Sequence, residues 1–151
     1  MKNLVKKLFT KEDLAAIAAA ISEAEKTTAG EIRVSIRQKR RWREKKLSIE
    51  EMARREFHDL GMTKTKDHTG ILIFLLMDER KFFILADEGI HTKVEEATWT
   101  KIAEEMSSHF SKKNFHQGLI HGVQAVGRIL SRFFPRKAND TNELPNDVHV
   151  H

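Results

Sequence analysis

The stretch Ile71-Leu72-Ile73-Phe74-Leu75-Leu76-Met77 decides the fold that we predict for this chain. Seven consecutive apolar residues are too many for a strand with one face in water, so the run predicts a central strand buried on both sides. Asp78-Glu79-Arg80-Lys81 is a short polar turn, and the apolar residues 82–86 follow it. The two apolar runs therefore predict an antiparallel hairpin.

The predicted hairpin brings two acidic residues together. Asp67 lies just before the first strand, and Asp87 lies just after the second. In an antiparallel hairpin the start of one strand and the end of the next lie at the same edge, which we name the acidic edge. Two carboxylates so close together repel each other, and they usually hold a cation or a proton between them.

A strand and a helix precede the hairpin. Residues 31–37 alternate polar and apolar side chains, as in a strand with one face on the core, and Ser48 with Glu51 is the capping box of a following helix. Strand, helix and buried strand make a right-handed βαβ unit with parallel strands. This geometry places Glu31, at the start of the first strand, at the acidic edge as well.

Helical periodicity recurs before and after these elements. Capping boxes begin further helices at Thr10 and Thr92, and Pro135 stops the last helix. We therefore expect an α/β/α three-layer sandwich in which helices flank a small mixed sheet. Residues 1–135 form the single domain of this prediction, and the polar residues 136–151 are expected to be a loosely ordered tail.

Composition excludes several classes of site. The 151 residues include no cysteine, so a disulfide, a thiolate zinc site and a cysteine nucleophile are excluded. No run approaches the roughly 20 apolar residues of a membrane span. The apolar stretch at residues 1–9 is broken by lysines and is too short for a signal peptide. We expect a cytoplasmic protein without a transmembrane segment.

Positive charge is concentrated in one segment. Residues 37–46 hold seven basic residues and one acidic residue, whereas the whole chain has a net charge of only +5. The basicity is therefore a local patch on a nearly neutral body. We name this segment the basic loop.

The basic loop is a candidate surface for an anionic partner. The indole of Trp42 can stack on a base or lie at a lipid headgroup. We expect a protein or an anionic membrane surface rather than nucleic acid, because no helix-turn-helix, RRM or KH motif is visible. A solvated loop with Trp42 packed onto the sheet is the alternative. The candidate residues are Arg37, Lys39, Arg40, Arg41, Trp42 and Arg43.

The residues around the hairpin resemble a known family. The runs Lys66-Asp67-His68-Thr69-Gly70-Ile71-Leu72-Ile73 and Asp87-Glu88-Gly89-Ile90-His91 are similar to those of the TPM family, which is named after a thylakoid lumen protein, a photosystem repair protein and a worm receptor modulator. The likeness spans roughly residues 10–134, and the runs at 28–34 and 142–145 also resemble a bacterial stand-alone branch of the family. The chain departs from the pattern at His68-Thr69, where Asn is usual, and at Asp87-Glu88-Gly89, where Gly-Tyr-Gly is commoner.

The resemblance implies an α/β/α fold, binding of a divalent cation and, from the thylakoid members, acid phosphatase activity. Hard cations such as Ca²⁺ and Mg²⁺ prefer oxygen ligands, and the resemblance suggests Ca²⁺ in particular. Turn and cap hydrogen bonds are the alternative, purely structural role for these carboxylates. The candidate ligands at the acidic edge are Glu31, Asp67, Asp87 and Glu88.

An enzymatic role is left open by the sequence. In a metal-assisted phosphatase the ion polarises a phosphoryl oxygen, and His68 or His91 acts as general acid or base. The sequence has no Gly-x-Ser-x-Gly motif, no phosphate-binding glycine-rich loop and no Asp-x-Asp step. The acidic edge is also opposite to the carboxyl ends of the parallel strands, where open α/β sheets bind ligands. We therefore expect a cation-binding interaction module, with a weak acid phosphatase as the alternative.

Overall fold

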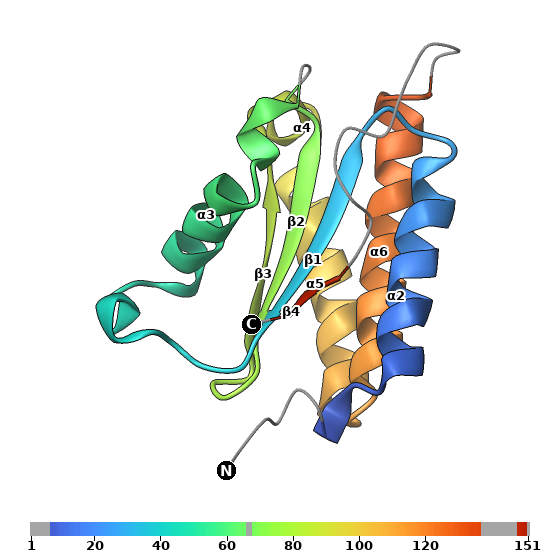
Figure 1. The fold of residues 1–151 in the computed structure, drawn as a ribbon. Helices are drawn as coiled ribbons and strands as arrows, with labels where there is room; N and C mark the ends of the chain where they lie inside the picture. The colour runs from blue at the N-terminus through green and yellow to red at the C-terminus, as the bar shows by residue number, and fades with distance from the viewer. Residues whose placement is uncertain (1–6, 66–67, 137–147, 151) are drawn as a thin grey trace.

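The computed structural model describes residues 7–65, 68–136 and 148–150. A four-stranded sheet in the order β3-β2-β1-β4 forms its centre, with helices on both faces (Figure 1). The predicted α/β/α sandwich is confirmed. Helix α3 (Ile49–Asp59) covers one face, and the opposite face is covered by α2 (Lys11–Glu25), α5 (Glu96–Ser111) and α6 (Phe115–Phe133).

The strand pairings are those that the sequence predicts. Strand β2 (Gly70–Leu76) pairs parallel with β1 (Glu31–Arg37). It pairs antiparallel with β3 (Lys81–Ala86), and the register places Ile71 opposite Ala86. The sheet is therefore mixed, and β2 lies inside it.

Strand β2 is buried on both faces, as its apolar sequence predicts. All seven of its residues are buried. Ile71, Ile73 and Leu75 pack into the core that α2, α5 and α6 share, whereas Leu72 and Phe74 pack into a second core beneath α3. Burial of apolar surface on both sides makes β2 the element that joins the two cores.

Strand β1 departs from its predicted pattern. The sequence predicts one face on the core and one face in water, but every residue of β1 is buried. Ile32, Val34 and Ile36 enter the core beneath α2 and α6. On the other face, Arg33 and Arg37 are only 1% and 3% exposed. The polar face is buried because its charges are paired with carboxylates, several of them from other elements.

Arg33 lies between two buried carboxylates. Its guanidinium nitrogens are 3.3 Å from Glu25, in the last turn of α2, and 3.4 Å from Glu31 on the same strand. Burial raises the pKa of Glu25 above its usual value, although the N–H of Ile32, which donates to this carboxylate, and the charge of Arg33 lower it. Burial likewise lowers the pKa of Arg33, against the charges of both glutamates. This cluster ties the end of α2 to the start of β1.

Arg37 makes a second buried cluster. It donates a hydrogen bond to Glu44, in the short 3-10 helix η1 (Trp42–Glu44), and its Nη2 is 3.3 Å from Glu56 of α3. Ser35 donates a hydrogen bond to the second carboxylate oxygen of Glu56. Burial raises the pKa of Glu44, but hydrogen bonds and nearby arginine charges outweigh it and leave the pKa below its usual value. The cluster fixes η1 and α3 on the polar face of β1.

The helix starts agree with the sequence in two cases and differ in a third. The side chains of Thr10 and Ser48 cap α2 and α3 as predicted. The helix expected to begin at Thr92 begins later, as α5, and a short helix α4 (Glu88–His91) precedes it. The difference arises because Asp87 accepts a hydrogen bond from the first N–H of α4 and starts a helical turn there.

The connection from α3 to β2 turns at a glycine. Gly61 adopts φ = 74°, in the left-handed region that glycine tolerates best. The 3-10 helix η2 (Met62–Lys64) follows, with Met62 buried in the core beneath α3. The chain then reaches Lys66 and Asp67, which lie outside the described residues.

The end of the chain adds the outer strand beside β1. Strand β4 (His149–Val150) runs parallel to β1, opposite Ser35 and Ile36. Residues 137–147 of the predicted tail lie outside the described residues. The last part of the segment expected to be loosely ordered is therefore paired to the sheet.

The first prediction concerns the buried charges of β1. Replacing Arg33 by alanine leaves Glu25 and Glu31 buried without their cation, and breaking such a pair costs about 3–5 kcal/mol. We expect Arg33→Ala to lower the free energy of unfolding by this amount, measured by urea denaturation followed by circular dichroism. Arg33→Lys keeps the charge, but a lysine lacks the fork of donors that contacts both carboxylates. We therefore expect it to lower the free energy of unfolding by less than Arg33→Ala does.

The control is Arg54→Ala, which removes an arginine from the exposed pair with Glu50. Exposed helix pairs contribute about 0.5 kcal/mol or less, so this change is expected to have little effect. If Arg33→Ala and Arg54→Ala lowered the free energy of unfolding equally, the claim that buried ion pairs stabilise the polar face of β1 would be contradicted.

Candidate functional site

Three segments meet at the acidic edge, as the hairpin and the βαβ unit predict. The N–H of Asp87 donates to the carbonyl of Gly70 at 2.9 Å, and the N–H of Gly89 donates to the carbonyl of His68 at 3.0 Å. The parallel register places Glu31 beside Gly70. Asp67 precedes His68 in the chain and lies outside the described residues.

Asp87 occupies the end of β3 and the start of α4. Its Oδ1 accepts a hydrogen bond from the N–H of Glu88 at 2.8 Å. Its Oδ2 is buried and has no hydrogen-bond partner in the described part of the chain. Nδ1 of His68 lies 3.6 Å from Oδ2, which is too long for a hydrogen bond. A buried carboxylate oxygen without a partner is costly, and a cation is one way to satisfy it.

Glu31 and Glu88, the other candidate ligands that the structure describes, differ in the exposure of their carboxylates. The backbone of Glu31 lies at the acidic edge, but its carboxylate is buried on the polar face of β1, where Arg33 contacts it. Glu88 is exposed next to Asp87. Within residues 7–65, 68–136 and 148–150, no group of three or more histidine, aspartate or glutamate side chains is placed to hold a metal ion. The described carboxylates available at the edge are therefore those of Asp87 and Glu88.

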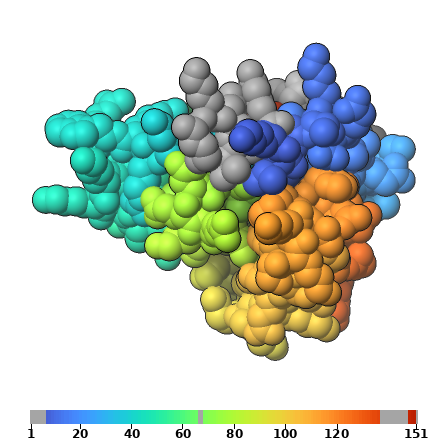
Figure 2. Space-filling view, turned by 90° about the horizontal axis from the view of Figure 1, so that it is seen from below, coloured from blue at the N-terminus to red at the C-terminus, as the bar shows by residue number. Residues whose placement is uncertain are grey.

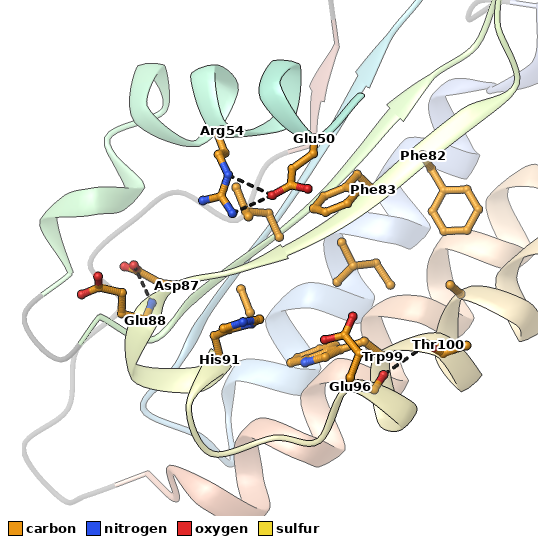
Figure 3. Close-up of a pocket in the computed structure, with 14 residues that line it drawn as sticks. Glu50, Arg54, Phe82, Phe83, Asp87, Glu88, His91, Glu96, Trp99 and Thr100 are labelled. Atoms are coloured by element: carbon orange, nitrogen blue, oxygen red, sulfur yellow. Dashed lines mark hydrogen bonds and ion pairs between the residues drawn. The ribbon is translucent and has the colours of Figure 1, made fainter. Parts of the chain in front are cut away.

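The acidic edge opens into a groove of about 620 Å³ that runs along β3. Figure 3 shows Glu50 and Arg54 of α3 on one side of the strand, and Trp99 of α5 on the other. Asp87, with Glu88 beside it, lies at one end of this groove. The acidic edge is thus continuous with a space that can admit a larger ligand.

The basic loop divides into anchored and exposed residues. Arg37 is buried with Glu44 and Glu56. Arg40 makes hydrogen bonds to the carboxylate of Glu79, in the turn of the hairpin, and its guanidinium also donates to backbone carbonyls of the loop. The hydrogen bond from Arg40 lowers the pKa of Glu79 below its usual value. Two of the four arginines that the sequence assigned to a partner, Arg37 and Arg40, are therefore engaged within the protein.

The remaining candidates of the basic loop face solvent. Trp42 is 81% exposed, so it does not pack onto the sheet, and Lys39, Arg41 and Arg43 are exposed as well. Figure 2 shows the segment that carries this loop, in cyan, standing out to one side of the body. Arg41 and Arg43 also line a cleft of about 510 Å³ with α3. No helix in the described part of the chain is long and apolar enough to cross a bilayer.

Sequence reasoning missed the groove along β3. The apolar pattern of residues 82–86 predicts a strand but does not say that one edge of this strand is open. Trp99 belongs to the core and is only 9% exposed, but it also lines the groove. The contribution of Glu50 and Arg54 had no signal in the sequence, because their helix reaches β3 only in the folded chain.

Comparison with known proteins identifies relatives of the chain. The family model described as the TPM domain matches residues 5–129. The solution structure of the BA42 protein from the psychrophilic bacterium Bizionia argentinensis is 34% identical, with a TM-score of 0.86 over 95% of each chain. A search of curated proteins finds no match.

Two further solved structures share the fold. The N-terminal domain of a P. gingivalis protein is 20% identical, with a TM-score of 0.67 over 83% of this chain and 78% of that one. The N-terminal domain of the cg2496 protein from Corynebacterium glutamicum is 14% identical, with a TM-score of 0.61 over 81% of this chain and 74% of that one. The family match covers most of the chain and agrees with the residues around the hairpin, so this chain belongs to the TPM domain family.

Proposed function

We propose that this TPM domain binds a divalent cation, Ca²⁺ in the first place, at the acidic edge and acts as an interaction module. The observation that carries the proposal is the buried Oδ2 of Asp87, which has no hydrogen-bond partner in the described part of the chain. Glu88, exposed beside it, and Asp67, which precedes His68, complete the proposed ligands. We leave Glu31 out of the ligand set because Arg33 engages its carboxylate.

The chemistry of the donors fits Ca²⁺. This ion takes six to eight oxygen ligands in a flexible geometry, and carboxylates supply its charge balance. A small number of carboxylates leaves several positions for water and backbone carbonyls. Such a site is expected to bind weakly and to exchange its ion readily.

The alternative at the same edge is a weak metal-assisted acid phosphatase. The groove beside Asp87 and Glu88 leaves room for a phosphate ester, and His91 lines it at the same end. A bound cation would supply charge stabilisation for a phosphoryl oxygen. No nucleophile motif accompanies these residues, so we rank the binding module first.

The second prediction tests the cation. Isothermal titration of chelator-treated protein with Ca²⁺ is expected to show one saturable site, and Asp87→Asn is expected to weaken it about tenfold or more, because the amide removes the charge that a hard cation requires. Asp78→Asn is the matched control, since Asp78 is an exposed aspartate in the turn at the opposite end of the hairpin. Unchanged affinity in Asp87→Asn would contradict the proposed site.

The same samples separate a module from an enzyme. Hydrolysis of p-nitrophenyl phosphate that is lost both in chelator and in Asp87→Asn would support the phosphatase. Saturable Ca²⁺ binding without hydrolysis would support the module.

We further propose that the exposed part of the basic loop docks on an anionic membrane surface. Trp42 lies between Arg41 and Arg43 in the chain, and all three side chains are exposed. An exposed indole next to arginines suits the headgroup region, where its ring meets lipid and its neighbours meet phosphate. The acidic edge and this loop lie at opposite ends of β1, so both sites are free to act together.

The third prediction tests the loop with vesicles that contain phosphatidylserine. Each basic residue near an anionic surface contributes about 1 kcal/mol, so Arg41→Glu with Arg43→Glu is expected to weaken binding more than about tenfold in a sedimentation assay. Lys11→Glu with Lys112→Glu makes the same change in net charge at exposed positions elsewhere and is expected to have a small effect. Equal effects of the two double variants, or no binding at low salt, would contradict a membrane partner at this loop.

A further inference from the structure

Strand β3 presents an open edge. It pairs with β2 on one side, and its other side pairs with no strand in the described part of the chain. The N–H of Asp87 donates to the carbonyl of Gly70, which fixes the alternation of ladder hydrogen bonds between the two strands. By that alternation, the amide and carbonyl groups of Phe82, Ile84 and Ala86 point away from β2.

This edge lacks the devices that usually protect an outer strand. Natural sheets block such edges with a proline, a bulge, an inward-pointing charge or a covering element. Between Phe82 and Ala86 there is no charged residue and no proline, and the register with β2 continues without a bulge. Phe82, Phe83 and Ile84 are only half-buried. The edge is therefore suited to receive another strand.

The two helices beside β3 turn this edge into a groove. Glu50 and Arg54 of α3 form one wall, and Trp99, Thr100 and Ala103 of α5 belong to the other (Figure 3). The side chains of β3 alternate between them, since Phe83 packs in the core of α3 whereas Ile84 packs in the core of α5 and α6. A strand laid along β3 would alternate in the same way, with one set of side chains on each wall.

Polar groups without partners lie along the groove. The indole Nε1 of Trp99 and the Oδ2 of Asp87 are buried without a hydrogen-bond partner in the described part of the chain, and both residues line the groove. The charged lining groups are four carboxylates and one guanidinium, namely Glu50, Asp87, Glu88, Glu96 and Arg54. Arg54 is already paired with Glu50. The unpaired charge of the groove is therefore negative and is concentrated near Asp87.

We propose that β3 receives an extended peptide segment of a partner protein as an added antiparallel strand. The segment carries apolar side chains at alternate positions and a basic residue at its amino-terminal end, which reaches the carboxylates near Asp87. Main-chain hydrogen bonds to Phe82, Ile84 and Ala86 supply affinity, and the two walls supply selectivity. This inference does not rest on the proposed cation site.

A second copy of the chain does not fit this edge as well as a single peptide strand. The β3 strand of a second copy carries its own α3 and α5 on both sides, so these helices would meet the walls of the first groove. The only charged residue of the β3 strand that a second copy would bring is Lys81, at the start of that strand. A lone extended segment brings no such walls.

The test uses the synthetic peptide acetyl-Lys-Val-Thr-Val-Thr-Val-Thr-amide and the isotope-labelled full chain in chelator. We expect saturable NMR shifts along β3 and slower hydrogen exchange of the amides of Phe82, Ile84 and Ala86. Two N-methylated peptides, each blocking alternate amides, discriminate main-chain pairing from simple apolar contact. One of them is expected to lose at least about tenfold in affinity, and the other is expected to bind nearly as the parent, because only alternate amides of an added strand face β3.

Two protein variants complete the test. Ile84→Pro removes an outward N–H and leaves the ladder with β2 intact, so binding is expected to be lost while the circular dichroism spectrum is kept. Glu88→Lys reverses an exposed charge beside Asp87 and is expected to weaken the lysine peptide several-fold, but not a version with norleucine in place of lysine. This second variant keeps the test decisive if Ile84→Pro does not fold. Absence of shifts along β3 at millimolar peptide, or equal binding of the two N-methylated peptides, would overturn the proposal.

Discussion

The pairing of two buried arginines on β1 is the constraint on which the rest of the structure depends. Arg33 holds Glu25 at the end of α2, and Arg37 holds Glu44 of η1 and Glu56 of α3. A buried guanidinium is tolerated only with its carboxylates in contact, so the helices on both faces must meet β1 at fixed positions. Apolar burial around β2 joins the layers, and the charged face of β1 sets how they are aligned.

This constraint also sorts the charged residues into structural and functional groups. Glu31 and Arg37 look like surface residues in the sequence, but both carry a partner inside the fold. Among the candidate site residues, those that stay available lie at the two ends of β1. Asp87 keeps a carboxylate oxygen without a hydrogen bond among the described residues, and the loop around Trp42 keeps its exposed arginines. Asp87 adjoins the groove along β3, and the loop around Trp42 adjoins the cleft that Arg41 and Arg43 line with α3. We place the proposed interactions at these two ends of β1.

The sequence predicts the parts of the fold that depend on local pattern. The apolar run of β2, the polar turn of the hairpin and the caps at Thr10 and Ser48 each act over a few residues, and the structure agrees with them. The buried polar face of β1 was not predictable in this way, because the partners of Arg37 come from other elements. The open edge of β3 was hidden for the same reason, since the order of strands follows from the whole topology.

The most direct test of this account measures the side-chain carboxyl carbons of Asp87 and Glu31 by NMR during a Ca²⁺ titration. Both residues reach the acidic edge through their backbones, but only Asp87 has a buried carboxylate oxygen that lacks a hydrogen-bond partner among the described residues. The account predicts that the Asp87 signal moves saturably with Ca²⁺ and that the Glu31 signal stays in place, because Arg33 holds its carboxylate. Saturable movement of Glu31 together with Asp87, or movement of neither, would contradict it.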